Sequence, residues 1–485
     1  MSALSLPATL GDALWRAARL ASAEPALVGE FGSLSWAELA TRVHSVAARL
    51  GTLATPDPDD GAAPRPHAVP LKPDRDDVIV LLAHALAGIP LLPLHPALPE
   101  ADAARLARAA GARQLTVEQC LQAAPATATP PPRPPLPGDD LFLVPTSGSS
   151  GAPKLARLTH RAVLAAAAAL TARLPFGPQD RWILTLPLSH VGGLSVVTRC
   201  VVACRAIVLV PRFSEDAVWT ALVRDGGTRL SAVPAIADRL LHADPGGRLA
   251  RLSLVMLGGQ AAPLALRRAL AEAGVPAVAS YGLTESCAAA ACEAPADAGR
   301  LRPGCGRALR GVTITIADED GRALPAGAPG RILLASPALL AGYAGQPDLP
   351  ALDTAGRLDT GDLGWLDDAG RLHVQGRRAE LIVTGGEKVV PGVVEAALRE
   401  HPAVRDAVVF GLADARWGAI VCAAVEGPAT LAQDPTLAAL LATLLPPWAR
   451  PRRMAVFETL PRLSTGKVDR RGTAALAAAR SHPWP

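Results

Sequence analysis

The sequence predicts an α/β protein with a large N-terminal domain, made of doubly wound α/β layers plus a small β-barrel or sheet, and a small C-terminal α+β domain. Three observations predict this fold class. The 485 residues exceed what one hydrophobic core usually supports. Short apolar runs alternate with alanine-rich helical stretches over most of the chain. Beyond about Gly306 the pattern becomes rich in strands and turn residues, and it alternates again near the C-terminus.

The N-terminal part carries the alternating pattern most clearly. Its longest apolar stretch, Val78 to Leu98, contains His84, Pro90 and Pro93. We therefore expect a buried helix that runs into a buried strand, and not a membrane span. Residues 122–140, QAAPATATPPPRPPLPGDD, are rich in proline and predict an extended, exposed linker inside the N-terminal domain.

From Leu141 onward, apolar runs predict strands that helices separate. The run LFLVP leads into the loop TSGSSGAPK, which we expect to open into a helix that begins near Thr159. Further expected strands are WILTLPL, AIVLVPRF, RLSAVP, LSLVMLGG, VTITIAD, GRILLAS, GRLHVQG, ELIVTGG, AVVFGLA and RMAVFETLP. We place a boundary near residues 376–379, which divides the chain into domains 1–376 and 377–485.

The composition excludes several classes of protein. The net charge is +4, and the arginines are dispersed among acids, so no nucleic-acid partner is expected. Nothing indicates a membrane partner, and Asp12 and Glu24 interrupt the N-terminal apolar residues where a secretory signal would need an apolar core. The seven cysteines form neither a CxxC pair nor a zinc-ligand spacing. These observations predict a cytoplasmic protein with reduced thiols.

Lysine is rare in this chain. Only four of the 48 basic residues are lysines: Lys72, Lys154, Lys388 and Lys467. An ammonium differs from a guanidinium in shape, hydration and donor geometry, so lysine is expected to persist where that chemistry matters. Three of the four lie in short Gly-rich loops. A compositional bias with random survivors is the alternative, but the loop lysines are the first candidates for an active site.

The strongest single motif is the loop from Thr146 to Lys154. Its glycines let backbone amides turn inward, its hydroxyls add donors, and Lys154 adds positive charge, at an expected strand-to-helix junction. The spacing is not that of a Walker loop. A surface linker of serine and glycine is the alternative. The expected nucleotide phosphate-binding residues are Thr146, Ser147, Gly148, Ser149, Ser150, Gly151 and Lys154.

A second motif is SYGLTES, residues 280–286, which follows an apolar run and is expected at a strand end. Tyr281 and Gly282 are expected nucleotide contacts, because the tyrosine offers a flat face to a base. Thr284 offers a hydroxyl to a phosphate oxygen, and Glu285 offers a carboxylate suited to Mg²⁺ with phosphate. A tyrosine buried in the core is the alternative.

Two motifs lie nearer the C-terminus. LDTGDLGWLDD, residues 358–368, carries Asp362, which is suited to accept from both hydroxyls of a ribose; a tight turn between strands is the alternative. LPRLSTGKVDRR, residues 460–471, carries Lys467 after a glycine, where an ammonium suits the charge of a phosphoryl group in a transition state. Taken alone, the second segment is more typical of a surface turn.

In this order the motifs resemble the adenylate-forming superfamily of acyl-CoA ligases, adenylation domains and luciferases, over roughly Pro25 to Arg471. In that family a TSGSSGxPK loop holds ATP phosphates, YGLTE binds the adenylate and magnesium, and TGDLG holds the ribose. GRxxELI carries a hinge, and a C-terminal GK supplies the catalytic lysine. Here GRRAELIVTGGEKVVP, residues 376–391, matches the hinge motif. The resemblance implies a C-terminal domain that is mobile about Ala379.

The resemblance also implies a reaction and residue roles. ATP and a carboxylic acid form an acyl-adenylate, and CoA then takes the acyl group in the same site. The implied catalytic residues are Lys467, Thr284 and His190, the histidine lying between the acyl pocket and the thiol tunnel. Other implied contacts are Asp362 and Arg377 for the ribose, Gly258, Gly259 and Gln260 for the adenine and acyl groups, and Gly385 and Gly386 for the thiol tunnel.

Within the superfamily the chain looks most like the o-succinylbenzoate-CoA ligases of menaquinone synthesis, through LPLSHVGGLSVVTR, VMLGGQAAP and GGEKVVPGVVEAAL. Arg199, nine residues after His190, is suited to a second carboxylate on such an acid; a solvated arginine is the alternative. Three residues depart from that pattern. Ser189 stands where an aromatic is usual, Lys388 where asparagine is usual, and Ala379 where a polar side chain is common.

Other functions remain open at this point. A ligase for another aryl or fatty acid has the same motifs, and so does a stand-alone adenylation enzyme that loads a carrier protein in trans. ATP, a carboxylic acid and CoA are the expected partners, with Mg²⁺ accompanying ATP. The sequence leaves the oligomeric state open, a homodimer included.

Overall fold

The computed structural model describes residues 7–53, 64–122, 134–146, 154–244, 246–346, 348–462 and 468–484. The chain divides into two compact units. Unit 1 contains Met1–Ile314 and Leu334–Leu358, and unit 2 contains Thr315–Leu333 and Asp359–Pro485. A functional division into domains 1–376 and 377–485 stays a prediction.

The larger sheet of unit 1 has nine strands in the order β14-β13-β12-β11-β10-β8-β9-β1-β2. Strands from β12 to β1 pair in parallel, and the edge strands pair antiparallel. The central strands β8 to β11 are buried along their whole length, which is typical of a parallel sheet. The strands are β1 Pro25–Gly29, β2 Gly32–Ser35, β8 Trp182–Leu184, β9 Ile207–Leu209, β10 Arg229–Ala232, β11 Leu254–Leu257, β12 Ala277–Tyr281, β13 Ala291–Cys292 and β14 Arg307–Ala308.

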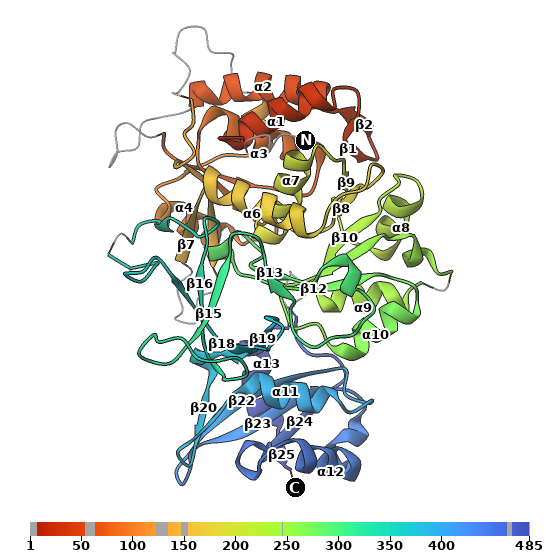
Figure 1. The fold of residues 1–485 in the computed structure, drawn as a ribbon, viewed down its shortest axis with the longest axis vertical. Coiled ribbons are helices and arrows are strands. Elements are labelled where there is room, and N and C mark those ends of the chain that lie inside the picture. Colours follow the sequence, from red (N-terminus) through yellow and green to blue (C-terminus); the bar gives the residue numbers. More distant parts are fainter. Residues whose placement is uncertain are drawn as a thin grey trace. The chain divides into compact units, whose positions relative to one another are not determined.

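Helices alternate with these central strands along the chain, in the α/β order that the sequence predicts. Near the N-terminus, α1, α2 and α3 pack against one another (Figure 1). Thr9 closes the start of α1 with a capping box, in which its hydroxyl accepts from the amide of Asp12. The helices of unit 1 are α1 Leu10–Leu20, α2 Trp36–Leu53, α3 Arg75–Ala87, α4 Glu100–Ala109, α5 Val117–Gln122, α6 His160–Arg173, α7 Val191–Ala203, α8 Glu215–Val223, α9 Pro234–His242 and α10 Leu264–Glu272, with 3-10 turns η1 Arg248–Arg251, η2 Thr284–Ser286 and η3 Pro295–Asp297.

The second sheet of unit 1 has six strands in the order β17-β7-β6-β4-β3-β5. The apolar stretch Val78 to Leu98 forms most of the buried helix α3 and then the buried strand β4, so that prediction is confirmed. Among the described ranges, no helix combines the length and apolar character needed to cross a bilayer. The strands are β3 His67–Pro70, β4 Leu91–Leu94, β5 Arg113–Gln114, β6 Asp140–Thr146, β7 Lys154–Thr159 and β17 Gly342–Tyr343.

One prediction at this sheet is wrong. The loop that follows β6 was expected to open into a helix, but its last residue, Lys154, begins strand β7, which returns antiparallel beside β6. Helix α6 begins only at His160, with Thr159 as its N-cap. The segment KLARLT forms a strand because it pairs with β6 on one side and β17 on the other. The amides of a helix N-terminus are therefore not available at Lys154.

Unit 2 contains most of the β-rich stretch and the C-terminal α+β part. The β-rich stretch forms a four-stranded sheet in the order β15-β16-β18-β19, and the C-terminal part forms a β20-β21 hairpin and a sheet in the order β22-β23-β24-β25. Its strands are β15 Thr313–Ala317, β16 Gly330–Ala335, β18 Leu358–Leu366, β19 Leu372–Arg377, β20 Ile382–Thr384, β21 Glu387–Val389, β22 Asp406–Asp414, β23 Gly418–Glu426, β24 Arg453–Phe457 and β25 His482–Pro483. Its helices are α11 Pro391–Arg399, α12 Pro435–Leu444 and α13 Arg470–Arg480, with 3-10 turns η4 Arg378–Glu380, η5 Ala429–Gln433 and η6 Pro447–Ala449.

Candidate active site

Two neighbouring strands of the nine-stranded sheet end at two of the predicted motifs. Residues 258–260 follow β11, and Tyr281 ends β12, which runs parallel beside it. Ser280 joins the two ends, because its hydroxyl donates to the carbonyl of Leu257 at 2.9 Å. A Cβ added at Gly258 would lie 2.8 Å from the Ser280 hydroxyl oxygen. The structure thus gathers the predicted adenine- and acyl-binding residues Gly258, Gly259, Gln260 and Tyr281 at the carboxyl edge of a parallel sheet, where ligands of α/β folds usually bind.

The turn after Tyr281 requires glycine. A Cβ at Gly282 would lie 1.5 Å from the carbonyl oxygen of Ala288, so no other residue fits this backbone. The next residues, Thr284–Ser286, form the single 3-10 turn η2. Tyr281, Thr284 and Glu285 are all half-buried. The alternative in which Tyr281 is enclosed in the core is therefore wrong.

Glu285 contacts a tyrosine from a distant segment. The hydroxyl of Tyr343 in β17 donates to Oε1 of Glu285 at 3.3 Å. The amide of Leu340 donates to the backbone carbonyl of Glu285 at 2.9 Å. Lys154 Nζ lies 5.1 Å from the centre of the Tyr343 ring. The predicted phosphate-binding lysine and the predicted Mg²⁺ carboxylate therefore flank one aromatic side chain.

Thr146 and Lys154 mark the two ends of the Gly/Ser loop. They are opposite one another in the register of β6 and β7, and the Thr146 side chain is buried. The remaining predicted phosphate contacts, Ser147, Gly148, Ser149, Ser150 and Gly151, lie outside the described residues. The pairing of β6 with β7 therefore places Thr146 and Lys154, the residues on either side of the loop, opposite each other.

The residues present fit Mg²⁺ bound together with a nucleotide. Magnesium usually keeps several water and phosphate ligands and takes only one or two protein carboxylates. Glu285 supplies one carboxylate, and in the described part of the chain no group of three metal-ligating side chains surrounds it. That donor set suits a cation carried by ATP phosphates and does not suit an all-protein cage.

An apolar pocket lies between helices α6 and α7. Arg199 is 1% exposed at its edge, so the alternative of a solvated arginine is wrong. Its guanidinium donates to Ser195 twice, to the carbonyl at 2.7 Å and to Oγ at 2.8 Å. Burial lowers the pKa of Arg199 to about 10. Among the described residues no carboxylate lies within ion-pair distance of this cation.

His190 occupies a different environment from Arg199. It is the N-cap residue of α7, and it is exposed. The next residue, Val191, lines the apolar pocket, but His190 does not belong to the pocket lining. The structure therefore places the histidine at the end of the helix that carries Arg199, outside the pocket itself.

The predicted ribose-binding pair lies in unit 2. Asp362 and Arg377 are opposite one another on the antiparallel strands β18 and β19, and Arg377 Nε lies 2.9 Å from Asp362 Oδ1. Arg377 also donates to the carbonyl of Thr360 at 3.0 Å. The alternative of a tight turn is wrong, because the motif forms the strand β18, with Asp362 on its buried face.

The predicted thiol-tunnel glycines form the tip of the β20-β21 hairpin. Gly385 and Gly386 have φ values of +59° and +87°, which glycine adopts without strain. The Gly385 amide donates to the carbonyl of Trp417 at 2.9 Å, and a Cβ at Gly385 would lie 2.7 Å from the indole. Two guanidinium groups, of Arg416 and Arg452, lie 5.0 and 4.4 Å from the centre of the Trp417 ring. The hairpin tip therefore packs against an aromatic side chain flanked by two cations.

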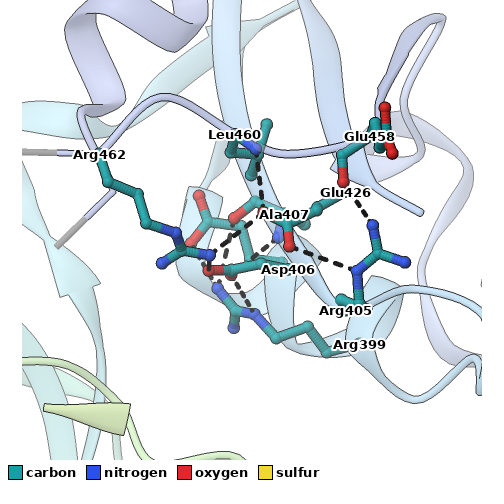
Figure 2. A network of polar contacts seen from close by, with 9 residues as sticks. Arg399, Arg405, Asp406, Ala407, Glu426, Glu458, Leu460 and Arg462 are labelled. Atoms are coloured by element: carbon teal, nitrogen blue, oxygen red, sulfur yellow. Dashed lines mark hydrogen bonds and ion pairs between the residues drawn. The ribbon is translucent and has the colours of Figure 1, made fainter. Parts of the chain in front are cut away.

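Lys467 lies outside the described residues, but both of its flanks are described. Arg462 and Val468 form an antiparallel bridge across residues 463–467. Figure 2 shows the polar network on the first flank, in which Arg462 Nη2 lies 3.1 Å from Oε2 of Glu426. The Leu460 amide donates to the same oxygen at 2.9 Å. Glu426 therefore anchors the chain just before the predicted catalytic segment.

Two residues of this region escaped the sequence analysis. Tyr343 had no motif, and its only signal is that it is one of two tyrosines in the chain. Trp182 lies in a strand that was predicted, yet nothing in the sequence indicates that its ring stacks with Arg199 at 4.1 Å. The Tyr343 contact joins segments 58 residues apart, and the Trp182 contact joins a strand to the helix that follows it.

Two family models match this chain. The AMP-binding enzyme family matches residues 14–344, and the AMP-binding enzyme C-terminal domain matches residues 393–467. A sulfoacetate–CoA ligase of Cupriavidus necator is 35% identical over 72% of this chain and 70% of its own length. A 2-succinylbenzoate–CoA ligase of Bacillus mycoides is 33% identical over 68% of this chain and 69% of its own length.

Solved structures show the same architecture. The o-succinylbenzoate CoA synthetase of Bacillus subtilis, in complex with its acyl-adenylate intermediate, has a TM-score of 0.83 and 26% identity over 96% of this chain and 98% of that chain. The same enzyme in complex with ATP and magnesium ion also has a TM-score of 0.83, with 95% and 99% covered and 26% identity. An amide bond synthetase from Marinactinospora thermotolerans has a TM-score of 0.84 and 27% identity, with 96% and 99% covered.

Proposed function

The chain belongs to the AMP-binding enzyme family and is an AMP-forming acid–CoA ligase, and from that premise we propose that its acid carries a second anionic group and is o-succinylbenzoate. The two curated relatives support the wider class. Sulfoacetate has a sulfonate beside its carboxylate, and 2-succinylbenzoate has two carboxylates. Both acids therefore need a cation in addition to the groups that activate the reacting carboxylate.

The single observation that carries the proposal is the buried cation of Arg199. A guanidinium that is 1% exposed and has no described acidic partner is costly, unless a ligand supplies the negative charge. Arg199 is also preorganised, because Ser195 and the Trp182 ring hold its plane. A fixed guanidinium suits the two oxygens of a carboxylate.

The rest of the pocket lining favours an acid with an apolar body. Its other lining residues are mostly apolar: Phe142, Leu158, Val163, Ala166, Ala167, Leu170, Val191, Leu194, Cys287 and Ala289. Burying an apolar group against such a lining is favourable at about 25 cal/mol per Å² of apolar area. Sulfoacetate has no comparable apolar body, so the pocket supports o-succinylbenzoate between the two named acids.

In the proposed first half-reaction the acid carboxylate attacks the α-phosphorus of ATP and pyrophosphate leaves. Lys154 and the loop after Thr146 would hold the β- and γ-phosphates, and Thr284 would hold the α-phosphate. Mg²⁺, bound to Glu285 together with the phosphates, supplies charge neutralisation on the leaving group. Lys467 is proposed to stabilise the charge that develops at the α-phosphate.

In the proposed second half-reaction the CoA thiolate attacks the acyl carbonyl and AMP leaves. His190 is proposed to lie at the junction where acid and thiol meet, and the hairpin of Gly385 and Gly386 to line the thiol path. Asp362 and Arg377 are proposed to hold the ribose. A hinge at Ala379 would exchange Lys467 for this hairpin, so that one site serves both steps.

The test is a panel of acids, each supplied with ATP, Mg²⁺ and CoA, with AMP release as the measurement. We expect kcat/KM for o-succinylbenzoate to exceed that for benzoate and octanoate by about 100-fold, the worth of one desolvated charge pair of about 3 kcal/mol. Preference for sulfoacetate would keep the dianionic class and overturn the choice of acid. A kcat/KM for benzoate equal to that for o-succinylbenzoate would overturn the proposal that the acid carries a second anionic group. An acceptor assay with CoA, a phosphopantetheinylated carrier protein and ammonia separates a CoA ligase from the alternative that loads a carrier in trans.

A further inference from the structure

Tyr343 connects the two ends of the proposed triphosphate site. Its hydroxyl donates to Oε1 of Glu285 at 3.3 Å, and Lys154 Nζ lies 5.1 Å from the centre of its ring. An ammonium within about 6 Å of an aromatic face is attracted by the ring quadrupole. One half-buried side chain therefore contacts both the carboxylate proposed for Mg²⁺ and the lysine proposed for phosphate.

The backbone holds Tyr343 in this place on both sides. On one side, β17 pairs with β7, and the Ala344 amide donates to the Leu155 carbonyl at 2.9 Å. On the other side, the Leu340 amide donates to the Glu285 carbonyl at 2.9 Å. The ring is thus tied to the strand that begins with the lysine and to the turn that carries the carboxylate.

A tyrosine side chain is suited to lie between a carboxylate and an ammonium. A neutral phenol orients a carboxylate by one hydrogen bond but leaves its negative charge intact, whereas an arginine or lysine there would neutralise it. The ring likewise attracts the ammonium without cancelling its positive charge. Within the described residues no ion pair joins Lys154 to Glu285. Both charges are therefore left for ligands of opposite sign.

We propose that Tyr343 is a positioning residue for Mg²⁺-bound ATP, which orients Glu285 through its hydroxyl and Lys154 through its ring and keeps the two charges apart. This inference rests on the proposed function, because it requires that ATP binds at these two residues. Tyr343 acts only through its two neighbours. Its loss should therefore weaken the binding of the nucleotide with its metal and leave the later acyl transfer intact.

Two variants separate the two contacts. Tyr343→Phe keeps the ring and removes the hydroxyl, and Tyr343→Leu removes both. The matched control is Ser253→Ala, because the Ser253 hydroxyl donates to a carboxylate oxygen of Asp180 at 3.0 Å, at the amino-terminal edge of the nine-stranded sheet. The affinity of each full-length variant for ATP is measured by calorimetry in Mg²⁺ and again in excess chelator. The melting temperature of each variant is also measured.

We expect Tyr343→Phe to weaken ATP binding in Mg²⁺ by about 10- to 100-fold, which is the range for one hydrogen bond to a charged group. Binding in chelator should stay unchanged. Tyr343→Leu should weaken ATP binding both in Mg²⁺ and in chelator. Ser253→Ala should weaken ATP binding in neither condition. Steady-state assays should show a raised KM for Mg²⁺-bound ATP and an unchanged rate of thioester formation from supplied acyl-adenylate. A purely structural role would lower the rate of adenylation and the rate of thioester formation together.

Three results would overturn the inference. The first is that Tyr343→Phe binds ATP in Mg²⁺ within twofold of the unchanged protein. The second is that its loss of affinity persists in chelator. A fall in thioester formation equal to the fall in adenylation would also overturn it. If the unchanged protein itself failed to bind ATP in Mg²⁺, the proposed function would fail together with this inference. That outcome is distinct from the three, in which the unchanged protein binds normally.

Discussion

The guanidinium carbon of Arg199 lies 4.1 Å from the centre of the Trp182 ring, and both side chains are almost completely buried. The indole N–H of Trp182 donates to the hydroxyl of Ser231 at 3.1 Å, which fixes the ring. Burial lowers the pKa of Arg199 to about 10, so the guanidinium stays charged at neutral pH. The fold therefore holds a cation in an apolar place and keeps its orientation constant.

Replacing Arg199 with methionine tests the role of this charge. We expect Arg199→Met to lower kcat/KM for o-succinylbenzoate by about 100-fold and to leave kcat/KM for benzoate within threefold, because only the first acid presents a second carboxylate. The free energy of unfolding should stay level or rise by about 1 kcal/mol, since an apolar side chain of similar length replaces a buried charge. An equal loss for both acids would show instead that the pocket has collapsed.

The proposed catalytic lysine predicts a split between the two half-reactions. Lys467→Ala should abolish acid-dependent exchange of pyrophosphate into ATP, because a positive charge at the α-phosphate is lost. Conversion of supplied acyl-adenylate to thioester should be spared. Lys72→Ala is the control, because Lys72 has no proposed role, and it should leave both rates unchanged. Undiminished exchange in Lys467→Ala contradicts the assignment.

The network around Glu426 predicts a large effect on stability. Glu426 is 8% exposed and accepts from Arg462, Arg405 and the Leu460 amide (Figure 2). Glu426→Gln should lower the free energy of unfolding by about 2 kcal/mol, because the partly buried Arg462 loses its counter-charge. The measurement is denaturant unfolding of the full chain.

An exposed ion pair provides the control for that prediction. Arg322 and Asp320 form a pair 2.8 Å apart in which both side chains are more than 70% exposed. Asp320→Asn should change the free energy of unfolding by less than about 0.5 kcal/mol, as for most surface pairs. If the two variants changed the free energy of unfolding by similar amounts, the burial of Glu426 would not strengthen its contribution to stability.

Two buried histidines predict how stability depends on pH. His67 Nδ1 lies 3.0 Å from His84 Nε2, His84 Nδ1 lies 2.8 Å from the carbonyl of Val80, and both rings are 0% exposed. Burial lowers the pKa of His67 to about 3 and that of His84 to about 4. Because the unfolded chain takes up protons below about pH 6.5 and the folded chain does not, stability is fully present above that pH and is lost as pH falls.

The expected slope is about 1.4 kcal/mol per pH unit for each histidine between pH 6 and 4. His84→Gln keeps an amide for the hydrogen bond to Val80 and removes one titrating group, so it should lower the slope by about 1.4 kcal/mol per pH unit. His160, which is also buried and has a pKa lowered to about 4, keeps its own contribution. His242, whose side chain is 76% exposed, supplies the control variant His242→Gln, which should leave the slope unchanged. Unfolding measured at a series of pH values checks all three proteins.

Local patterns predicted most elements because each depends on nearby residues. The apolar stretch Val78 to Leu98 became a helix and a strand, and Thr159 became a helix cap, since periodicity and capping act within a few residues. The strand β7 was missed. KLARLT is a strand only because β6 and β17 pair with it, and that pairing depends on residues far along the chain.

The candidate site divides in the same way. The motifs around Thr146, Glu285 and Asp362 were visible in the sequence, because the proposed phosphate, metal and ribose contacts each require particular residue types close together. The burial of Arg199 had only a weak signal, the apolar character of α7 on all sides. Its stacking on Trp182 had none.

Most strands and helices, the type of each chemical group and the family could be read from residues that are close together in the chain. The contacts between those groups could not be read in this way. Tyr343 meets Glu285 and Lys154 because β17 pairs with β7 and the Leu340 amide donates to the Glu285 carbonyl. The buried guanidinium of Arg199 contacts Met256 of β11, which lies 57 residues further along the chain. Such contacts arise from long-range pairing and packing, whose energy depends on the whole fold and leaves no local pattern.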